Sequence, residues 1–402
     1  MAARATVETR RRGRQRSVSE GIERLVPSAV SPFASHALGA ARLQARRPPV
    51  DRQQQEPRAR HRPRLRTLDA PGDGPPRLSP RGRRVGALYA AVGEYAPSRL
   101  ANARVLARSW RTARADVWHF FFAPNPLTLR AGALAARLRR APTAHTLASA
   151  PDNLEAVAPM LFADRLVVLS EHTARRLRAV GRDAVVIPPA LSPVSVTPAQ
   201  VDAARRRYDL PARYALYPGD LEHSDGARTF VRAAAGHGGE LGWVVAARPK
   251  TPKAHEARRA LESEARALGA KVTWLGEIDD IHAVTAGAAV VTLAVDTLHA
   301  KMDLPLVLLE AMALRVPVVV SSGSAAEELV PSGGALAVPP SSPESLREAV
   351  AAISGDEGRS VAMGSDGARW VAERCAPDAV ALAYETVWDE LLRSGRARAG
   401  RV

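Results

Sequence analysis

Apolar and polar positions follow two periods along most of the chain after residue 84. Runs such as residues 241–247 and 316–320 are short and rich in β-branched residues, which predicts strands buried on both faces. Stretches such as residues 226–235 and 255–267 carry apolar residues at helical spacing. Strands that alternate with helices predict parallel sheets joined by right-handed crossovers, so we expect an α/β fold.

Residues 1–84 show neither period. They hold 20 arginines, no lysine and 7 acidic residues, with much proline, serine and glutamine. Such a composition cannot bury enough apolar surface to offset chain entropy, so we expect disorder. Three interpretations remain open: a solvated tail without a role, an arm that binds RNA or a membrane surface, and an artefactual or rearranged N-terminus.

Net charge and cysteine content limit which partners and which cellular compartment the sequence favours. The whole chain has 57 basic and 41 acidic residues, a net charge of +16, but most of the excess lies in residues 1–84. Basicity is therefore no evidence for a nucleic-acid-binding core, and we expect no obligate nucleic acid partner. The single cysteine, Cys375, suits a reducing cytosol. No apolar run reaches the 18 residues or so of a membrane span, so a cytoplasmic location is expected.

Breaks in these patterns predict four segments. Residues 1–84 form the basic tail, and residues 85–195 a partial first domain. A linker containing serine, proline and threonine precedes a second domain over residues 196–375, and residues 376–402 hold a last helix and a tail.

The chain is organised around residues 301–329, which predict a turn, a helix, a buried strand and a second helix start. We expect Asp303 to cap the first helix and Pro305 to lie in its first turn. Gly323 and Ser324 supply small residues after the strand, and Glu328 follows in the next helix. Open α/β sheets bind ligands at the carboxyl ends of their strands, so this loop is a candidate site.

The run L-P-L-V-L-L-E-A-M-A-L-R-V-P-V-V-V resembles the donor-binding segment of glycosyltransferase family 4. Residues 272–293 and 331–346 are similar to the family's flanking segments. The resemblance implies a GT-B fold, in which two Rossmann-like domains with parallel sheets face a cleft. The family's first strands and glycine-rich acceptor loop are not recognisable here, so the first domain is expected to be truncated.

The resemblance also implies an activity. The family's members are retaining glycosyltransferases that move a sugar from a nucleotide-sugar donor to an acceptor, here expected to be a sugar or a lipid. Retention in the family is generally attributed to front-face attack assisted by the leaving phosphate, which needs no enzyme nucleophile. No metal cluster is visible in the sequence, so we expect neither a metal nor a cofactor.

Donor contacts follow from the same match. Glu310 falls on the second motif glutamate, which implies that its carboxylate accepts the ribose hydroxyls, and Glu328 falls on the acidic residue after the glycine loop. Met302 replaces the first motif glutamate, and Asp303 is the candidate to compensate. Arg315 replaces the glycine that ends the family's helix, which predicts a left-handed residue or a different turn.

The diphosphate clamp departs most from the family. The family's arginine and lysine after the first glycine turn, here at Gly219, are replaced by Asp220 and Asp225. A carboxylate beside a diphosphate is repulsive, by about 1 kcal/mol at 4 Å in water. Candidate substitutes from loops at the same sheet edge are Arg248, Lys250 and Lys301.

His119 falls on a family histidine that helps orient the donor sugar, and it is our candidate catalytic residue; His145 is a weaker one. Each is also consistent with a satisfied histidine at a strand end. A basic helix over residues 127–140 is either solvated or lies on anionic lipid, which would place the protein peripherally at the inner face of the membrane.

Two other function classes stay open. The first is a GT-B scaffold with impaired catalysis, because the clamp is altered. The second is a nucleic-acid-binding protein that acts through its arginine-rich tail.

Overall fold

The structure is a computed structural model that describes residues 115–139, 141–249, 251–298 and 302–399, together with residues 64–67, 77–78, 80–82 and 84–87. Two compact units emerge: residues 1–168, 174–187 and 381–402 form the first, and residues 169–173 and 188–380 the second. The predicted boundary at 195/196 falls shortly after this division. The last helix, α14 (Pro377–Ala399), joins the first unit from residue 381 onward.

The first unit is built on a seven-stranded sheet in the order β2-β3-β1-β4-β5-β6-β7, in which β2 alone is antiparallel. Its strands are β1 Arg64–Thr67, β2 Arg77–Leu78, β3 Arg84–Ala87, β4 Val117–Phe121, β5 Thr143–Leu147, β6 Arg165–Val168 and β7 Ala184–Val186. Its helices are α4 Pro126–Arg139, α5 Leu154–Val157, the 3₁₀ helix η2 Ala158–Met160, and most of α6 Glu171–Ala179 and α14.

Two of these strands correct the sequence-based picture. β1 and β2 lie within residues 1–84, so the prediction of disorder up to residue 84 is wrong for them. β1 pairs in parallel with both β3 and β4, and the first domain is therefore less truncated than expected. A strand that reads R-L-R-T has too few apolar residues to stand out, and long-range pairing decides its conformation. The sequence also predicts a helix over residues 99–111, which lies outside the described residues.

The second unit holds a six-stranded parallel sheet in the order β10-β9-β8-β11-β12-β13. Its strands are β8 Tyr214–Tyr217, β9 Gly242–Ala246, β10 Val272–Leu275, β11 Val290–Leu293, β12 Val318–Ser321 and β13 Ala335–Val338. Its helices are α7 Pro198–Arg207, α8 Gly226–Ala235, α9 Pro252–Ala267, α10 Ile281–Ala286, α11 Leu306–Ala313, the 3₁₀ helix η3 Ala325–Ser332, α12 Pro343–Ser354 and α13 Glu357–Arg374.

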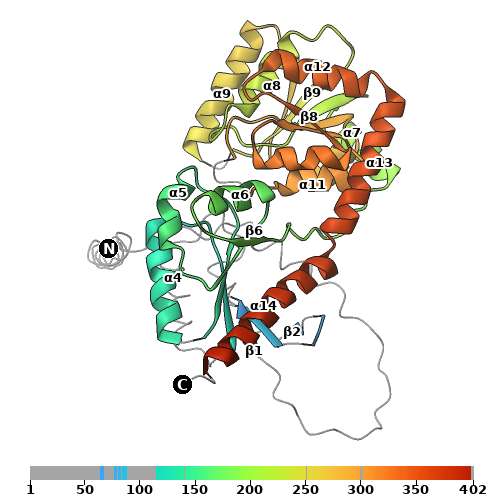
Figure 1. Cartoon of the computed structure of the whole chain (residues 1–402). Helices are drawn as coiled ribbons and strands as arrows, with labels where there is room; N and C mark the ends of the chain where they lie inside the picture. The colour runs from blue at the N-terminus through green and yellow to red at the C-terminus, as the bar shows by residue number, and fades with distance from the viewer. Residues whose placement is uncertain are drawn as a thin grey trace, which may run out of the picture. The chain divides into compact units, whose positions relative to one another are not determined.

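Helices cover this sheet as expected for a doubly wound fold. α8 packs against α9 and α12, whereas α11 packs against α13 (Figure 1). α11 also packs against α10. The strands β8, β11 and β12 are buried along their whole length, which explains why they read as continuous apolar runs. None of the helices that the structure describes is long and apolar enough to cross a bilayer.

Of the two alternatives for the end of α11, a left-handed residue or a different turn, the structure has the left-handed residue. Arg315 has a φ of 62° and is exposed. The Val316 N–H donates to the Ala311 carbonyl, and the Arg315 N–H donates to the Met312 carbonyl, both at 2.9 Å. This is a Schellman cap, which usually carries glycine because a Cβ is crowded in this conformation.

We expect Arg315→Gly to raise the free energy of unfolding of the second unit by about 1 kcal/mol, because glycine removes the left-handed penalty. Thermal or urea unfolding measures the change. Arg315→Ala is the matched control, since it removes the same guanidinium but keeps the Cβ. Equal stability of the glycine and alanine variants would contradict the strain argument.

Candidate functional site

The second unit has a topological switch point between β8 and β11. From β8 the chain proceeds outward to β9 and β10 on one side, then returns to β11 and continues to β12 and β13 on the other. The chain therefore leaves β8 and β11 toward opposite sides of the sheet, and such a switch point is where sheets of this kind bind ligands. The Asp225 N–H donates to Asp296 Oδ1 at 2.6 Å and links the two loops.

Gly219 stands at the turn after β8 for a steric reason. A Cβ there would overlap the ring of Tyr217. The Tyr217 ring is fully buried, and its hydroxyl donates to the Asp220 carbonyl at 2.9 Å. The turn is therefore fixed around a buried tyrosine, which explains the glycine without a ligand.

The two aspartates at the clamp positions have structural partners. Asp220 Oδ1 accepts the N–H groups of Glu222 at 3.1 Å and His223 at 2.6 Å, so it shapes the loop after β8. Asp225 pairs with Arg228 at 3.3 Å. The pair of Asp225 with Arg228 is part of a longer chain of charged residues on α8 and α9.

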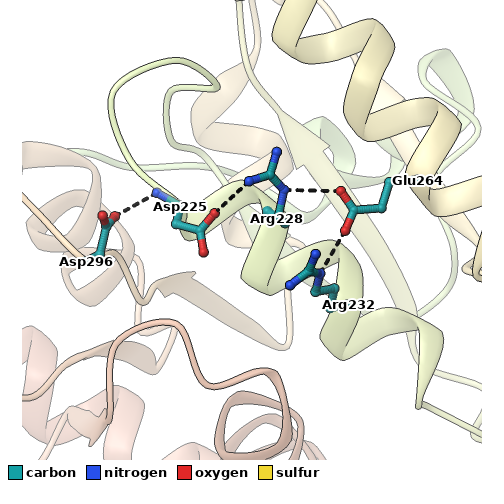
Figure 2. Close-up of polar contacts among 5 residues, drawn as sticks. All are labelled: Asp225, Arg228, Arg232, Glu264 and Asp296. Carbon is teal, nitrogen blue, oxygen red and sulfur yellow. Dashed lines mark hydrogen bonds and ion pairs between the residues drawn. The ribbon is translucent and has the colours of Figure 1, made fainter.

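Figure 2 shows this chain. Arg228 Nε lies 3.1 Å from one oxygen of Glu264, and Arg232 Nε lies 2.7 Å from the other. The two arginines hold the pKa of Glu264 below its ordinary value, although desolvation opposes them. At the other end the Asp296 carboxylate accepts the Asp225 N–H. Carboxylates thus occupy the start of α8, where a phosphate binds in many dinucleotide-binding folds.

Of the three cations that could replace the family's clamp, the structure describes Arg248. Arg248 follows β9, is exposed, and pairs with Glu277, which is also exposed. A surface ion pair of this kind contributes little to stability. Contact of Arg248 with a phosphate stays a prediction. Lys250 and Lys301 lie outside the described residues.

Glu310 lies on the second turn of α11 with its side chain 22% exposed. Its Oε2 atom is 3.7 Å from Nε2 of His282, which lies on α10 and is 45% exposed. The Glu310 carboxylate raises the pKa of His282 against a smaller effect of desolvation. Sequence reasoning missed His282, because no motif pairs the first turn of α10 with α11.

Asp303 does not cap α11, so that prediction is wrong. The N-cap is Pro305, with no side-chain capping bond. Asp303 is buried and accepts a hydrogen bond from Ser170 Oγ at 2.7 Å. A serine directly before a helix predicts an N-cap, and Ser170 confirms this for α6, because its Oγ also accepts the Thr173 N–H at 3.1 Å.

Glu328, like Asp303, serves the first residues of α6, which group with the second unit. Its two oxygens accept the backbone N–H groups of Glu171 and His172. A carboxylate at a helix N-terminus satisfies unpaired donors and complements the dipole. Glu328 is therefore engaged by the protein in this structure.

Gly323 and Ser324 form the turn after β12 that the sequence predicted. Gly323 has a φ of 75° and its N–H donates to Glu327 at 2.7 Å, while Ser324 is the N-cap of η3. Nothing lies within 4 Å of a Cβ at Gly323, so this backbone is open.

His119 lies in the first unit, fully buried at the middle of β4. Trp388 Nε1–H donates to its Nδ1 at 3.0 Å, so the proton of the neutral ring is on Nε2, which donates to Thr146 Oγ1 at 2.8 Å. Thr146 in turn lies 3.5 Å from the Tyr384 hydroxyl. Both nitrogens are taken by the protein, as in a satisfied core histidine, and contact with a donor sugar would require these bonds to open.

The basic helix α4 presents an exposed stripe of Arg130, Leu134, Arg137 and Leu138. The two leucines are 51% and 60% exposed. Contact of this stripe with a lipid surface stays a prediction.

The two buried histidines predict an acid-sensitive fold. Burial, with a smaller effect of His145, lowers the pKa of His119 to about 3, and burial lowers that of His145 to about 4. Between pH 6.5 and 4 these two histidines bind protons in the unfolded chain but not in the folded chain. The free energy of unfolding therefore falls as pH drops, by about 1 kcal/mol per pH unit for each histidine.

His119→Gln keeps a donor and an acceptor but does not titrate, so its loss of stability between pH 6.5 and 5 should be smaller than that of the wild type. Urea unfolding at several pH values measures the slopes, and His255→Gln, at an exposed position of α9, is the control. Identical slopes for wild type and His119→Gln would contradict the assignment.

Comparison with known proteins places these features in a family. The model described as Glycosyltransferase Family 4 matches residues 54–193, and the one described as Glycosyl transferases group 1 matches residues 212–356. No curated protein matches the sequence.

Similar solved structures include HepE (Alr3699) of Anabaena in complex with UDP, with a TM-score of 0.63 at 16% identity, covering 76% of this chain and 86% of that one. They also include sucrose-phosphate synthase of Thermosynechococcus elongatus, with a TM-score of 0.61 at 22% identity, covering 82% and 88%. A glycosyltransferase from Rickettsia africae gives a TM-score of 0.62 at 16% identity, covering 77% and 85%. At these identities the likeness shows a shared fold. The chain belongs to the glycosyltransferases of the GT-B fold, with a Glycosyltransferase Family 4 domain followed by a Glycosyl transferases group 1 domain.

Proposed function

We propose that this chain transfers a sugar from a nucleotide-sugar donor, with UDP as the carrier, to a sugar or lipid acceptor with retention of the anomeric configuration. Family membership supports glycosyl transfer, and similar structures were solved with UDP or with UDP-glucose. The observation that carries the proposal is Glu310, a half-buried carboxylate on the helix that follows β11 at the switch point.

Glu310 has the chemistry for a ribose. An ionised carboxylate accepts two hydroxyl hydrogen bonds, and such charge-assisted bonds are stronger than neutral ones. Its Oε2 atom lies 3.7 Å from Nε2 of His282, so a second side chain lies beside the carboxylate. The backbone at Gly323 offers an open approach after β12, since nothing lies within 4 Å of a Cβ placed there.

The mechanism that we propose needs no metal and no enzyme nucleophile. The leaving phosphate takes the acceptor proton on the face from which the nucleotide departs, and the protein binds and orients both substrates. His119 has no proton-transfer role in this scheme, because its pKa of about 3 and its two hydrogen bonds make it a poor base.

An impaired scaffold is the second candidate function, and a specific observation favours it. Asp220, Asp225 and Asp296 lie in the loops after β8 and β11, where the family's clamp neutralises a diphosphate. Each carboxylate opposes the ligand's charge. Measured binding of a nucleoside diphosphate separates the two candidates.

Calorimetric titration with UDP tests the donor site. We expect binding by the wild type, and a loss of about tenfold to a hundredfold in Glu310→Gln, because hydrogen bonds to a charged group are worth about 1.5–3 kcal/mol. Glu348→Gln, on an exposed position of α12, is the control. No heat or thermal shift with any nucleoside diphosphate would favour the scaffold, and unchanged binding by Glu310→Gln would remove Glu310 from the site.

Reversing the charges at the clamp positions should strengthen binding. Asp220→Arg with Asp225→Lys replaces two repulsive groups by attractive ones, and we expect UDP affinity to rise about tenfold or more, since each charge contributes about 1 kcal/mol at 4 Å in water. Uridine, which lacks phosphates, should bind both proteins equally well. A gain for uridine as large as for UDP would show that the change acts on the loop and not on the diphosphate.

A further inference from the structure

His282 and Glu310 come from different helices of the second unit and meet at its surface. His282 is in the first turn of α10 and Glu310 in the second turn of α11, and these helices pack against each other. The distance of 3.7 Å between His282 Nε2 and Glu310 Oε2 is that of an ion pair, longer than a normal hydrogen bond. Both side chains are partly exposed, so a ligand can reach the pair.

Other charges around α10 are already engaged with one another. Arg207 of α7 pairs with Asp279 at 3.3 Å and with Asp280, the N-cap of α10, at 3.0 Å. Glu277, just before them, pairs with Arg248. Glu310 is the single titratable residue of α11, so it is the residue of that helix with which His282 can form an ion pair.

We propose that His282 is a positioning residue for Glu310, and that the charged form of the imidazole is the form that favours nucleotide binding. This inference rests on the proposed function, in which Glu310 grips the ribose. A cation at 282 draws Oε2 to itself and leaves Oε1 for the ligand. It also offsets negative charge that would otherwise oppose a nucleoside diphosphate.

The direction of the pH effect follows from the pair. Glu310 raises the pKa of His282, so the imidazole is charged over a wider range than an ordinary histidine. Below that pKa the imidazole of His282 carries its positive charge beside Glu310, and above that pKa the site loses this charge. Affinity for UDP should therefore be higher at pH 6 than at pH 8.

The experiment compares UDP affinity at pH 6, 7 and 8 in the wild type, His282→Gln and His282→Lys. Because the terminal phosphate of UDP itself titrates near pH 6, the difference between variants is the quantity of interest. We expect the wild type to lose about threefold to tenfold more affinity than His282→Gln on going from pH 6 to pH 8. His282→Lys carries a charge throughout and should retain the affinity of the wild type at pH 6 up to pH 8. His255→Gln, on α9, should follow the wild type.

An NMR titration of the His282 ring measures its pKa in the absence of ligand and so tests the interaction with Glu310. Its pKa should lie above the ordinary value in the wild type and fall toward it in Glu310→Gln. The same pH profile for UDP in wild type and His282→Gln would overturn the proposal while leaving the donor site intact. Absence of UDP binding by the wild type at every pH would overturn the proposed function, and this inference with it.

Discussion

The pairing of β8 with β11 is the constraint on which the second unit depends. These strands are joined through two intervening strands and three helices, yet Ala215 aligns with Val290 and Leu216 with Val291 in one parallel register. Their neighbours then lie on opposite sides of the pair. The switch point at this edge, where sheets of this kind bind ligands, results from strand order alone, before any side chain is chosen.

Side chains then decide what that edge can bind, and here they are largely acidic. Asp296 accepts the N–H of the residue that caps α8, and Glu328 accepts two N–H groups at the start of α6. In both places a carboxylate of the protein takes a position where a helix N-terminus attracts anions. If the proposed diphosphate binds at this edge, its charge must be met by cations outside these turns, such as Arg248, which forms an exposed pair with Glu277.

In the first unit, polar side chains are buried beside the central strands and need hydrogen-bond partners there. Trp388, His119 and Thr146 form a chain in which every donor reaches an acceptor, and α14 supplies its first member from the far end of the sequence. A buried imidazole in such a chain is held neutral, because the charged form would place a second donor against the indole N–H. The C-terminal helix is thereby part of this unit's core.

The sequence by itself determined the α/β class, most strands and helices of the second unit and the cap at Ser170, and it reduced the end of α11 at Arg315 to two alternatives. These follow from local periodicity and turn chemistry, which short stretches of chain express without help from the rest. It did not reveal the strands at 64–67 and 77–78, the bond from Asp303 to Ser170, the buried setting of His119 or the partnership of His282 with Glu310. Each of these depends on groups brought together from distant parts of the chain. Only the tertiary structure decided them, because whether a polar residue faces a ligand, a backbone donor or another side chain depends on which elements pack beside it.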